Sequence, residues 1–180
     1  MAPGIVEAVS NDLALAVVTS TIRHLLAASL AAPEGPDGAQ VTTLHPRRLQ
    51  RAKGAPGLNV HLYAVAWNET LDRNRPPRAD RPPAGPDAGP DSVALDLHYL
   101  ITAHGDDALL EPQRLLARAA RALAGTPVLP RGTVDELGDE SPPVRLTATS
   151  LTLDEAAALW TALRMPSRPS LTCTASPVLL

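Results

Sequence analysis

The residues best suited to chemistry in this sequence are an aspartate and two histidines near one predicted strand. Asp96 and His98 are two residues apart, so a strand places them on one face, where a carboxylate can orient a general base. His104 follows His98 at six residues, which is no standard spacing for metal ligands. Because no nucleophile stands at a recognisable offset, we favour a polar sheet face that packs under a helix or against a partner. Asp96 and His98 are therefore interface candidates, and a small hydrolase or metal-dependent enzyme that also uses His104 is the alternative.

The common catalytic and cofactor motifs are absent from the sequence. It has no G-x-G-x-x-G after a strand, no phosphate-binding P-loop, no G-x-S-x-G and no H-E-x-x-H. The single cysteine, Cys173, lies in the apolar series of a predicted strand, which favours a buried small side chain over a reactive thiol. Asp106 and Asp107 are typical of the first turn of a helix. We predict that the protein is not an enzyme and holds no cofactor or metal.

The charge balance gives no global attraction for nucleic acid, because the formal net charge is −3. Two basic stretches stand out, and they contain Arg47, Arg48, Arg51 and Lys53 in the first and Arg73, Arg75, Arg78 and Arg81 in the second. The few aromatic residues fall in predicted core elements, not beside these stretches. We therefore expect a solvated or subunit-facing basic surface and no nucleic-acid partner, with a nucleic-acid binder as an alternative.

The first residues resemble neither a signal peptide nor a membrane anchor. No basic start is present, and the uncharged run Leu13–Ile22 is shorter than the roughly 20 residues that a membrane span needs. We expect a cytoplasmic protein without direct membrane contact.

Hydrophobic spacing predicts three long helices. The first covers Gly4–Ala31, where apolar residues recur at every third or fourth position. The second opens after Asp106–Asp107, has Pro112 near its first position and closes at Gly125. The third begins at a capping box, Thr152–Glu155, and runs to about Arg164.

Alternation of apolar and polar residues predicts four to five strands. They are expected at Val41–Leu44, Leu58–Trp67, Val93–Ala103, Val144–Thr149 and Ser170–Ser176. In the second of these, Leu58, Val60, Leu62, Ala64 and Ala66 are predicted to share one side. Strands interleaved with helices predict a mixed sheet flanked by helices, of the α/β or α+β class, in one domain over residues 1–180.

A zone rich in proline, glycine and arginine, at about residues 72–92, shows no hydrophobic periodicity. We interpret it as an extended arm or loop that starts with Arg73, Arg75, Arg78 and Arg81. One hypothesis is that it crosses to an adjacent subunit or to another component. The alternative is a plain surface loop.

Several segments together resemble one family, the cap or tail-terminator proteins of extracellular contractile injection systems, in the part that forms their N-terminal domain. The matching segments include Asn59–Val65, Leu95–Gly105, Leu151–Trp160 and Arg168–Leu171. The run Leu95–Leu100 (Leu-Asp-Leu-His-Tyr-Leu) is the most specific of them. The family often has tyrosine where this chain has His104, a minor departure.

The resemblance implies a mechanical function and a tail-terminator-like fold. Such proteins form a six-fold ring on the last layer of the inner tube and sheath, where they stop polymerisation and anchor the sheath for contraction. The implied partners are further copies of the chain, as a hexamer, together with the tube and sheath proteins. An adaptor that joins the tail to another component is the alternative within the same fold.

Overall fold

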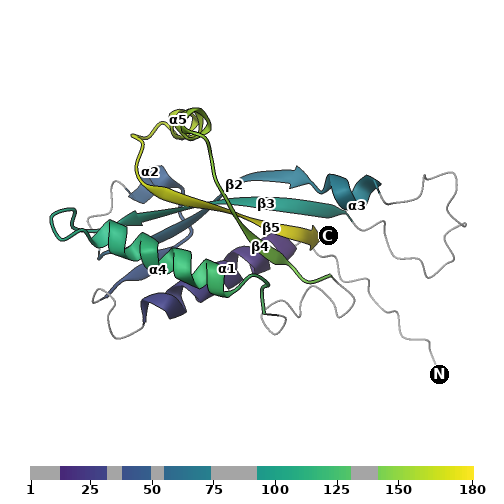
Figure 1. The fold of residues 1–180 in the computed structure, drawn as a ribbon, viewed down its shortest axis with the longest axis horizontal. Helices are drawn as coiled ribbons and strands as arrows, with labels where there is room; N and C mark the ends of the chain where they lie inside the picture. Colours follow the sequence, from purple (N-terminus) through teal and green to yellow (C-terminus); the bar gives the residue numbers. More distant parts are fainter. Residues whose placement is uncertain (1–12, 32–37, 50–54, 74–92, 131–141) are drawn as a thin grey trace, which may run out of the picture.

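The computed structural model describes residues 13–31, 38–49, 55–73, 93–130 and 142–180. Within these ranges the chain forms a five-stranded sheet and five helices (Figure 1). The strands are β1 (Gln40–Thr42), β2 (Gly57–Trp67), β3 (Ala94–His104), β4 (Arg145–Thr149) and β5 (Ser170–Leu179). The helices are α1 (Ala14–Leu30), α2 (Pro46–Leu49), α3 (Glu69–Arg73), α4 (Glu111–Gly125) and α5 (Leu153–Ala162).

The sheet is mixed, in the order β1-β2-β3-β5-β4. Only β1 runs parallel to its neighbour, and the pairs β2–β3, β3–β5 and β5–β4 are antiparallel. The expected mixed sheet flanked by helices is confirmed, and the strand predicted at Val41–Leu44 is present as β1. The two long central strands, β2 and β3, form a stiff platform of eleven residues each.

One face of the sheet is covered by α1 and α4, which lie side by side in Figure 1. Both helices bury every fourth residue, and these residues are Ala14, Val18, Ile22, Leu26 and Leu30 in α1, and Leu115, Ala119 and Leu123 in α4. They pack on the apolar side of β3, where Leu97, Tyr99 and Ile101 are fully buried. We call this side the helix-covered face.

The Tyr99 hydroxyl joins β3 to α1 through a hydrogen bond inside this core. Its oxygen lies 2.8 Å from Thr19 Oγ1, and that hydroxyl already donates to the Leu15 carbonyl at 2.7 Å. Tyr99 is therefore the donor to Thr19, so a fully buried phenol keeps its hydrogen bond.

The opposite side of the sheet, which we call the polar face, carries Asp96, His98, Leu100 and Thr102 of β3. It is only partly covered. A small separate cluster packs on Leu100, and its members are Trp160, Leu163 and Met165 from α5 and the residues after it. Figure 1 shows α5 on the side of the sheet away from α1 and α4.

Two irregularities correct the strand predictions. The β2–β3 register shifts between Leu62 and Ala64, so Ala64 and Ala66 pair with His98 and Asp96 on the polar face. The predicted single side for the whole of β2 is therefore wrong beyond Leu62, because an extra residue in one strand reverses the faces that follow.

The last strand was predicted to end at Ser176, but β5 continues to Leu179. A register shift between Leu95 and Leu97 of β3 falls opposite Ser176 and Pro177. Proline has no N–H for the ladder and is tolerated at such a bulge, so it does not end the strand.

The three long helices predicted from the sequence correspond to α1, α4 and α5. The stretch 4–12 of the first predicted helix lies outside the described residues. The prediction that Asp106 and Asp107 occupy the first turn of a helix is wrong, because α4 begins at Glu111 and the two aspartates belong to the turn before it. Pro112 does occupy the start of α4, and the capping box of α5 at Thr152–Glu155 is confirmed.

Candidate functional site

The carboxylate of Asp96 is used to hold the fold together. Its Oδ1 accepts hydrogen bonds from Asn68 Nδ2, at 2.7 Å, and from the Ser176 hydroxyl. Asn68 Oδ1 in turn accepts the Leu71 N–H, at 2.9 Å, and so caps α3. Asp96 thus fixes the β5 bulge to the end of β2. Its partners explain the residue without a catalytic role.

His98 and Asp96 are not hydrogen-bonded to each other. The Nδ1 of His98 lies 2.9 Å from Thr174 Oγ1 across the β3–β5 pair, and its ring is 6.1 Å from the Tyr63 ring. The Ser176 hydroxyl is bonded to Asp96 and not to His98. Ser176, His98 and Asp96 therefore do not form the chain of hydrogen bonds that a nucleophilic triad needs.

His104 lies at the other end of β3, beside a pocket of about 410 Å³ whose lining includes Asp107 and Arg168. Its Nδ1 is buried and has no hydrogen-bond partner among the described residues. Burial lowers the pKa of His104, the positive charge of Arg168 lowers it further, and the Ala55 carbonyl opposes both. Among the described residues, no three histidine, cysteine or carboxylate side chains are placed to hold a metal ion.

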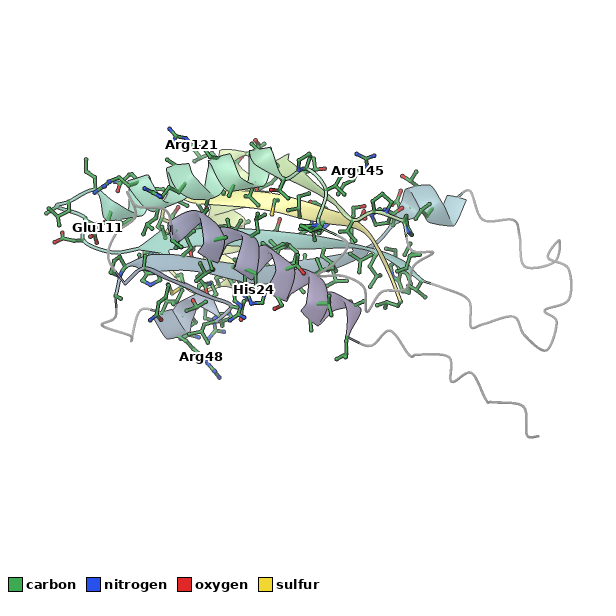
Figure 2. All side chains as sticks on the ribbon, turned by 90° about the horizontal axis from the view of Figure 1, so that it is seen from below. His24, Arg48, Glu111, Arg121 and Arg145 are labelled. Atoms are coloured by element: carbon green, nitrogen blue, oxygen red, sulfur yellow. The ribbon has the colours of Figure 1, made fainter. Side chains whose placement is uncertain are left out.

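The basic stretches are only partly described. Arg47 and Arg48 are exposed on the short helix α2, and Figure 2 shows Arg48 directed away from the body of the molecule. Arg73 closes α3. The other basic residues of the two stretches, Arg51, Lys53, Arg75, Arg78 and Arg81, lie outside the described residues.

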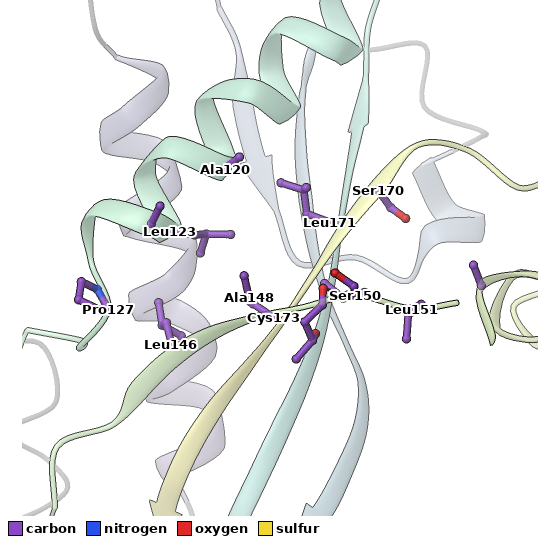
Figure 3. Close-up of a pocket in the computed structure, with 14 residues that line it drawn as sticks. Ala120, Leu123, Pro127, Leu146, Ala148, Ser150, Leu151, Ser170, Leu171 and Cys173 are labelled. Atoms are coloured by element: carbon purple, nitrogen blue, oxygen red, sulfur yellow. Dashed lines mark hydrogen bonds between the residues drawn. The ribbon is translucent and has the colours of Figure 1, made fainter. Parts of the chain in front are cut away.

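A groove of about 470 Å³ runs beside the edge strand β4. Figure 3 shows its walls, which come from α4, β4 and β5 and are mostly apolar. The principal side chains are Ala120, Leu123, Pro127, Leu146, Ala148, Leu151 and Leu171. Cys173 lies at its floor and is buried, and burial raises the pKa of its thiol to about 12. The prediction of a buried, unreactive cysteine is confirmed as to burial.

Backbone hydrogen bonds fix the part of this groove that Pro127 and Leu146 line. The Leu129 N–H donates to the Val144 carbonyl and the Leu146 N–H donates to the Pro127 carbonyl, each at 2.9 Å. The segment after α4 is therefore fastened along the start of β4. The groove is consequently a preformed feature of three packed elements.

Two neighbouring leucines stand out at the opposite end of α4. Leu109 is 62% exposed and Leu110 is 57% exposed, in the turn between β3 and α4. Sequence reasoning missed both this turn and the groove. The signal for the turn was available, since the two leucines are out of phase with the buried stripe at Leu115, Ala119 and Leu123. The groove had no local signal, because its walls come from distant parts of the chain.

The family follows from a match along most of the chain. A family model described as the Pvc16 N-terminal domain matches residues 17–180. The chain belongs to this family. No curated protein sequence matches this chain.

Solved structures share the fold of this Pvc16 N-terminal domain. One is the sheath/tube terminator of an extracellular contractile injection system, PVC, in the extended state, with 18% identity and a TM-score of 0.64 over 92% of this chain and 56% of that chain. Another is the tube-terminating cap of the anti-feeding prophage, with 18% identity and a TM-score of 0.59 over 91% of this chain and 54% of that chain. The chain thus spans a little over half the length of these relatives. The predicted tail-terminator-like fold is confirmed.

No helix within the described ranges is long and apolar enough to cross a membrane.

Proposed function

We propose that this chain is a structural cap subunit that ends the tube and sheath of a contractile injection system. The observation that carries the proposal is the fold shared over 92% of the chain with a sheath/tube terminator. The subunit forms a ring, which we expect to be a hexamer, on the distal layer of tube and sheath. There it stops polymerisation and anchors the sheath, after assembly in the cytoplasm.

The geometry of the chain suits a mechanical function better than a catalytic one. Asp96 and His98, the strongest candidates for acid–base chemistry, bond to separate partners. A ring subunit instead needs a stiff body with two different contact patches. The long antiparallel pair β2–β3, backed by α1 and α4, supplies the stiff body.

Several interface assignments belong to this proposal. The arm at about 72–92, with Arg73, Arg75, Arg78 and Arg81, reaches a neighbouring subunit or the sheath, and Asp96 and His98 belong to a contact face. One domain spans residues 1–180. Deleting residues 78–92 tests the arm, because a chain that assembles unchanged without them would show the arm to be a plain surface loop.

Reconstitution with the tube and sheath proteins of the same particle tests the function. We expect the chain to bind one end of each filament as a ring, and filaments grown with it to have a limited length, both visible by electron microscopy. Filaments whose ends stay bare would refute the proposal. Binding to ends without any effect on length would favour an adaptor. Retention of the chain on DNA at low salt would favour the nucleic-acid alternative.

A further inference from the structure

The turn between β3 and α4 presents two leucines on a rigid support. Asp106 Oδ1 accepts the Ala108 N–H at 2.8 Å, and the Asp106 N–H donates to Glu111 Oε2 at 2.7 Å. The Glu111 N–H donates back to the Asp106 carbonyl at 3.1 Å. The exposed side chains of Leu109 and Leu110 are therefore held in one place before any partner arrives, which reduces the entropy lost on binding.

Leu110 adopts a backbone conformation that a leucine normally avoids. Its φ is +54° and its ψ is +27°, in the left-handed region that favours glycine. A glycine would relieve this strain, yet the chain has an exposed leucine there. Strain that is retained together with an exposed apolar side chain indicates a function at the surface.

The groove at the other end of α4 has the complementary character. Its walls are mostly apolar, and at about 470 Å³ it has room for more than one leucine side chain. Arg121 follows Ala120 of the groove wall and is exposed, and Figure 2 shows it directed outward from α4. The turn Asp106–Leu110, which we call the leucine turn, instead contains the carboxylate of Asp107 and is followed by that of Glu111. Arg114, one helical turn further on, is the nearest cation on α4.

The leucine turn and the groove are too far apart to meet within one molecule. α4 has 15 residues and is therefore about 22 Å long. The turn precedes its first residue, whereas Ala120, Leu123 and Ala124 at its last turns line the groove. Figure 2 shows Glu111 at one end of the molecule and Arg145 toward the other. A contact between them must join two copies head to tail, and repeated head-to-tail contacts close into a ring or continue as a helix.

We propose that the leucine turn of one copy, Asp106–Leu110, inserts into the groove beside β4 of a second copy. This inference rests on the proposed function and adds the surfaces through which neighbouring ring subunits touch. Leu109 and Leu110 are the apolar anchors, and the acidic turn meets the arginine-bearing rim of the groove. Sodium chloride weakens the contact, because it screens exposed charges.

The variant Leu110→Gly separates folding from assembly. It removes an anchor side chain and also the backbone strain at φ +54°. We expect the thermal midpoint of the variant to stay the same or rise, and self-association to weaken by about 30-fold, as for a hot-spot residue. The control is Leu13→Asp, because Leu13 is 62% exposed, similar to the 57% of Leu110, but belongs to neither the turn nor the groove. Analytical ultracentrifugation gives both dissociation constants.

Mixing two defective chains tests the head-to-tail geometry. The first chain carries Leu109→Asp with Leu110→Gly and has no functional turn. The second carries Ala120→Glu, an exposed position on the groove wall, and has no functional groove. Each chain alone should be monomeric. An equal mixture should form one-to-one dimers and nothing larger, because only one intact turn and one intact groove remain in each pair.

The outcomes separate this contact from the proposed function. Rings that form normally from either defective chain, in solution or on filament ends, would overturn the contact and leave the cap function standing. Wild-type chain that never binds filament ends would overturn the cap function, whereas dimers in the mixture would still establish the contact. A mixture that stays monomeric while wild-type chain associates would rule out the head-to-tail contact.

Discussion

The two faces of the sheet differ in how their side chains are stabilised. On the helix-covered face, alternate residues of β3 are apolar and fully buried under α1 and α4. On the polar face, the residues between them bond to side chains of the neighbouring strands, as Asp96 does with Ser176 and His98 with Thr174. The first face supplies the stability of the subunit, while the second keeps a pattern of polar groups at the surface.

The faces also differ in the groups that can change charge near neutral pH. The helix-covered face holds Tyr99 and Cys173, and burial raises the pKa of both side chains, so they stay neutral. His61 and His104 point to the polar face, as shown by the pairing of His61 with Leu100 and by the alternation along β3, and burial lowers the pKa of both. The effect of mild acid through these two buried histidines should therefore come from the polar face.

The largest expected effect is on the helix-covered face. Leu97→Ala removes a fully buried side chain and leaves a cavity, so we expect the free energy of unfolding to fall by about 2–5 kcal/mol. Val65 is its cross-strand partner on the same face and is 47% exposed. Val65→Ala is therefore the matched control and should cost well under half as much. Equal losses in urea denaturation would contradict the assignment of the core.

On the polar face, the largest effect should come from Asp96. Asp96→Ala removes the acceptor for Asn68, which is only 8% exposed, and for Ser176. Leaving such a donor unpaired costs about 1–3 kcal/mol. Thr147→Ala, at an exposed position on the adjoining edge strand, should lie within about 0.5 kcal/mol of wild type. A neutral result for Asp96→Ala would show that its hydrogen bonds are not structural.

The difference between the faces also marks what the sequence could predict. The strand predicted at Val93–Ala103 and the capping box at Thr152 are local patterns, and both predictions are confirmed. The bulge near Tyr63 is not local, because an extra residue is recognised only against the partner strand more than 30 residues away. The groove at β4 and the separate partners of Asp96 and His98 also depend on contacts between distant parts of the chain, so the sequence did not predict them.

Acid should weaken the subunit through His61 and His104. Burial is the main cause that lowers the pKa of each from 6.5, with the charges of His45 and Arg168 as second causes. Between the lowered pKa and 6.5 the unfolded chain binds more protons than the folded chain. Stability is therefore complete above pH 6.5 and declines as the pH falls through this window. The double variant His61→Gln, His104→Gln should show a flatter decline in thermal midpoint from pH 7 to pH 5.

The smallest expected effect on folding is that of His98→Ala. The bond from its Nδ1 to Thr174 is part-buried, and such a bond contributes about 0.5–1 kcal/mol. Because the loss is small, the variant can be compared with wild type in the filament-end assay without a folding defect. If the polar face contacts a neighbouring subunit, the sheath or the tube, binding to filament ends should weaken while thermal stability hardly changes. Unchanged binding would remove His98 from the proposed contact face, and unchanged assembly would also leave no reason to assign the residue a catalytic role.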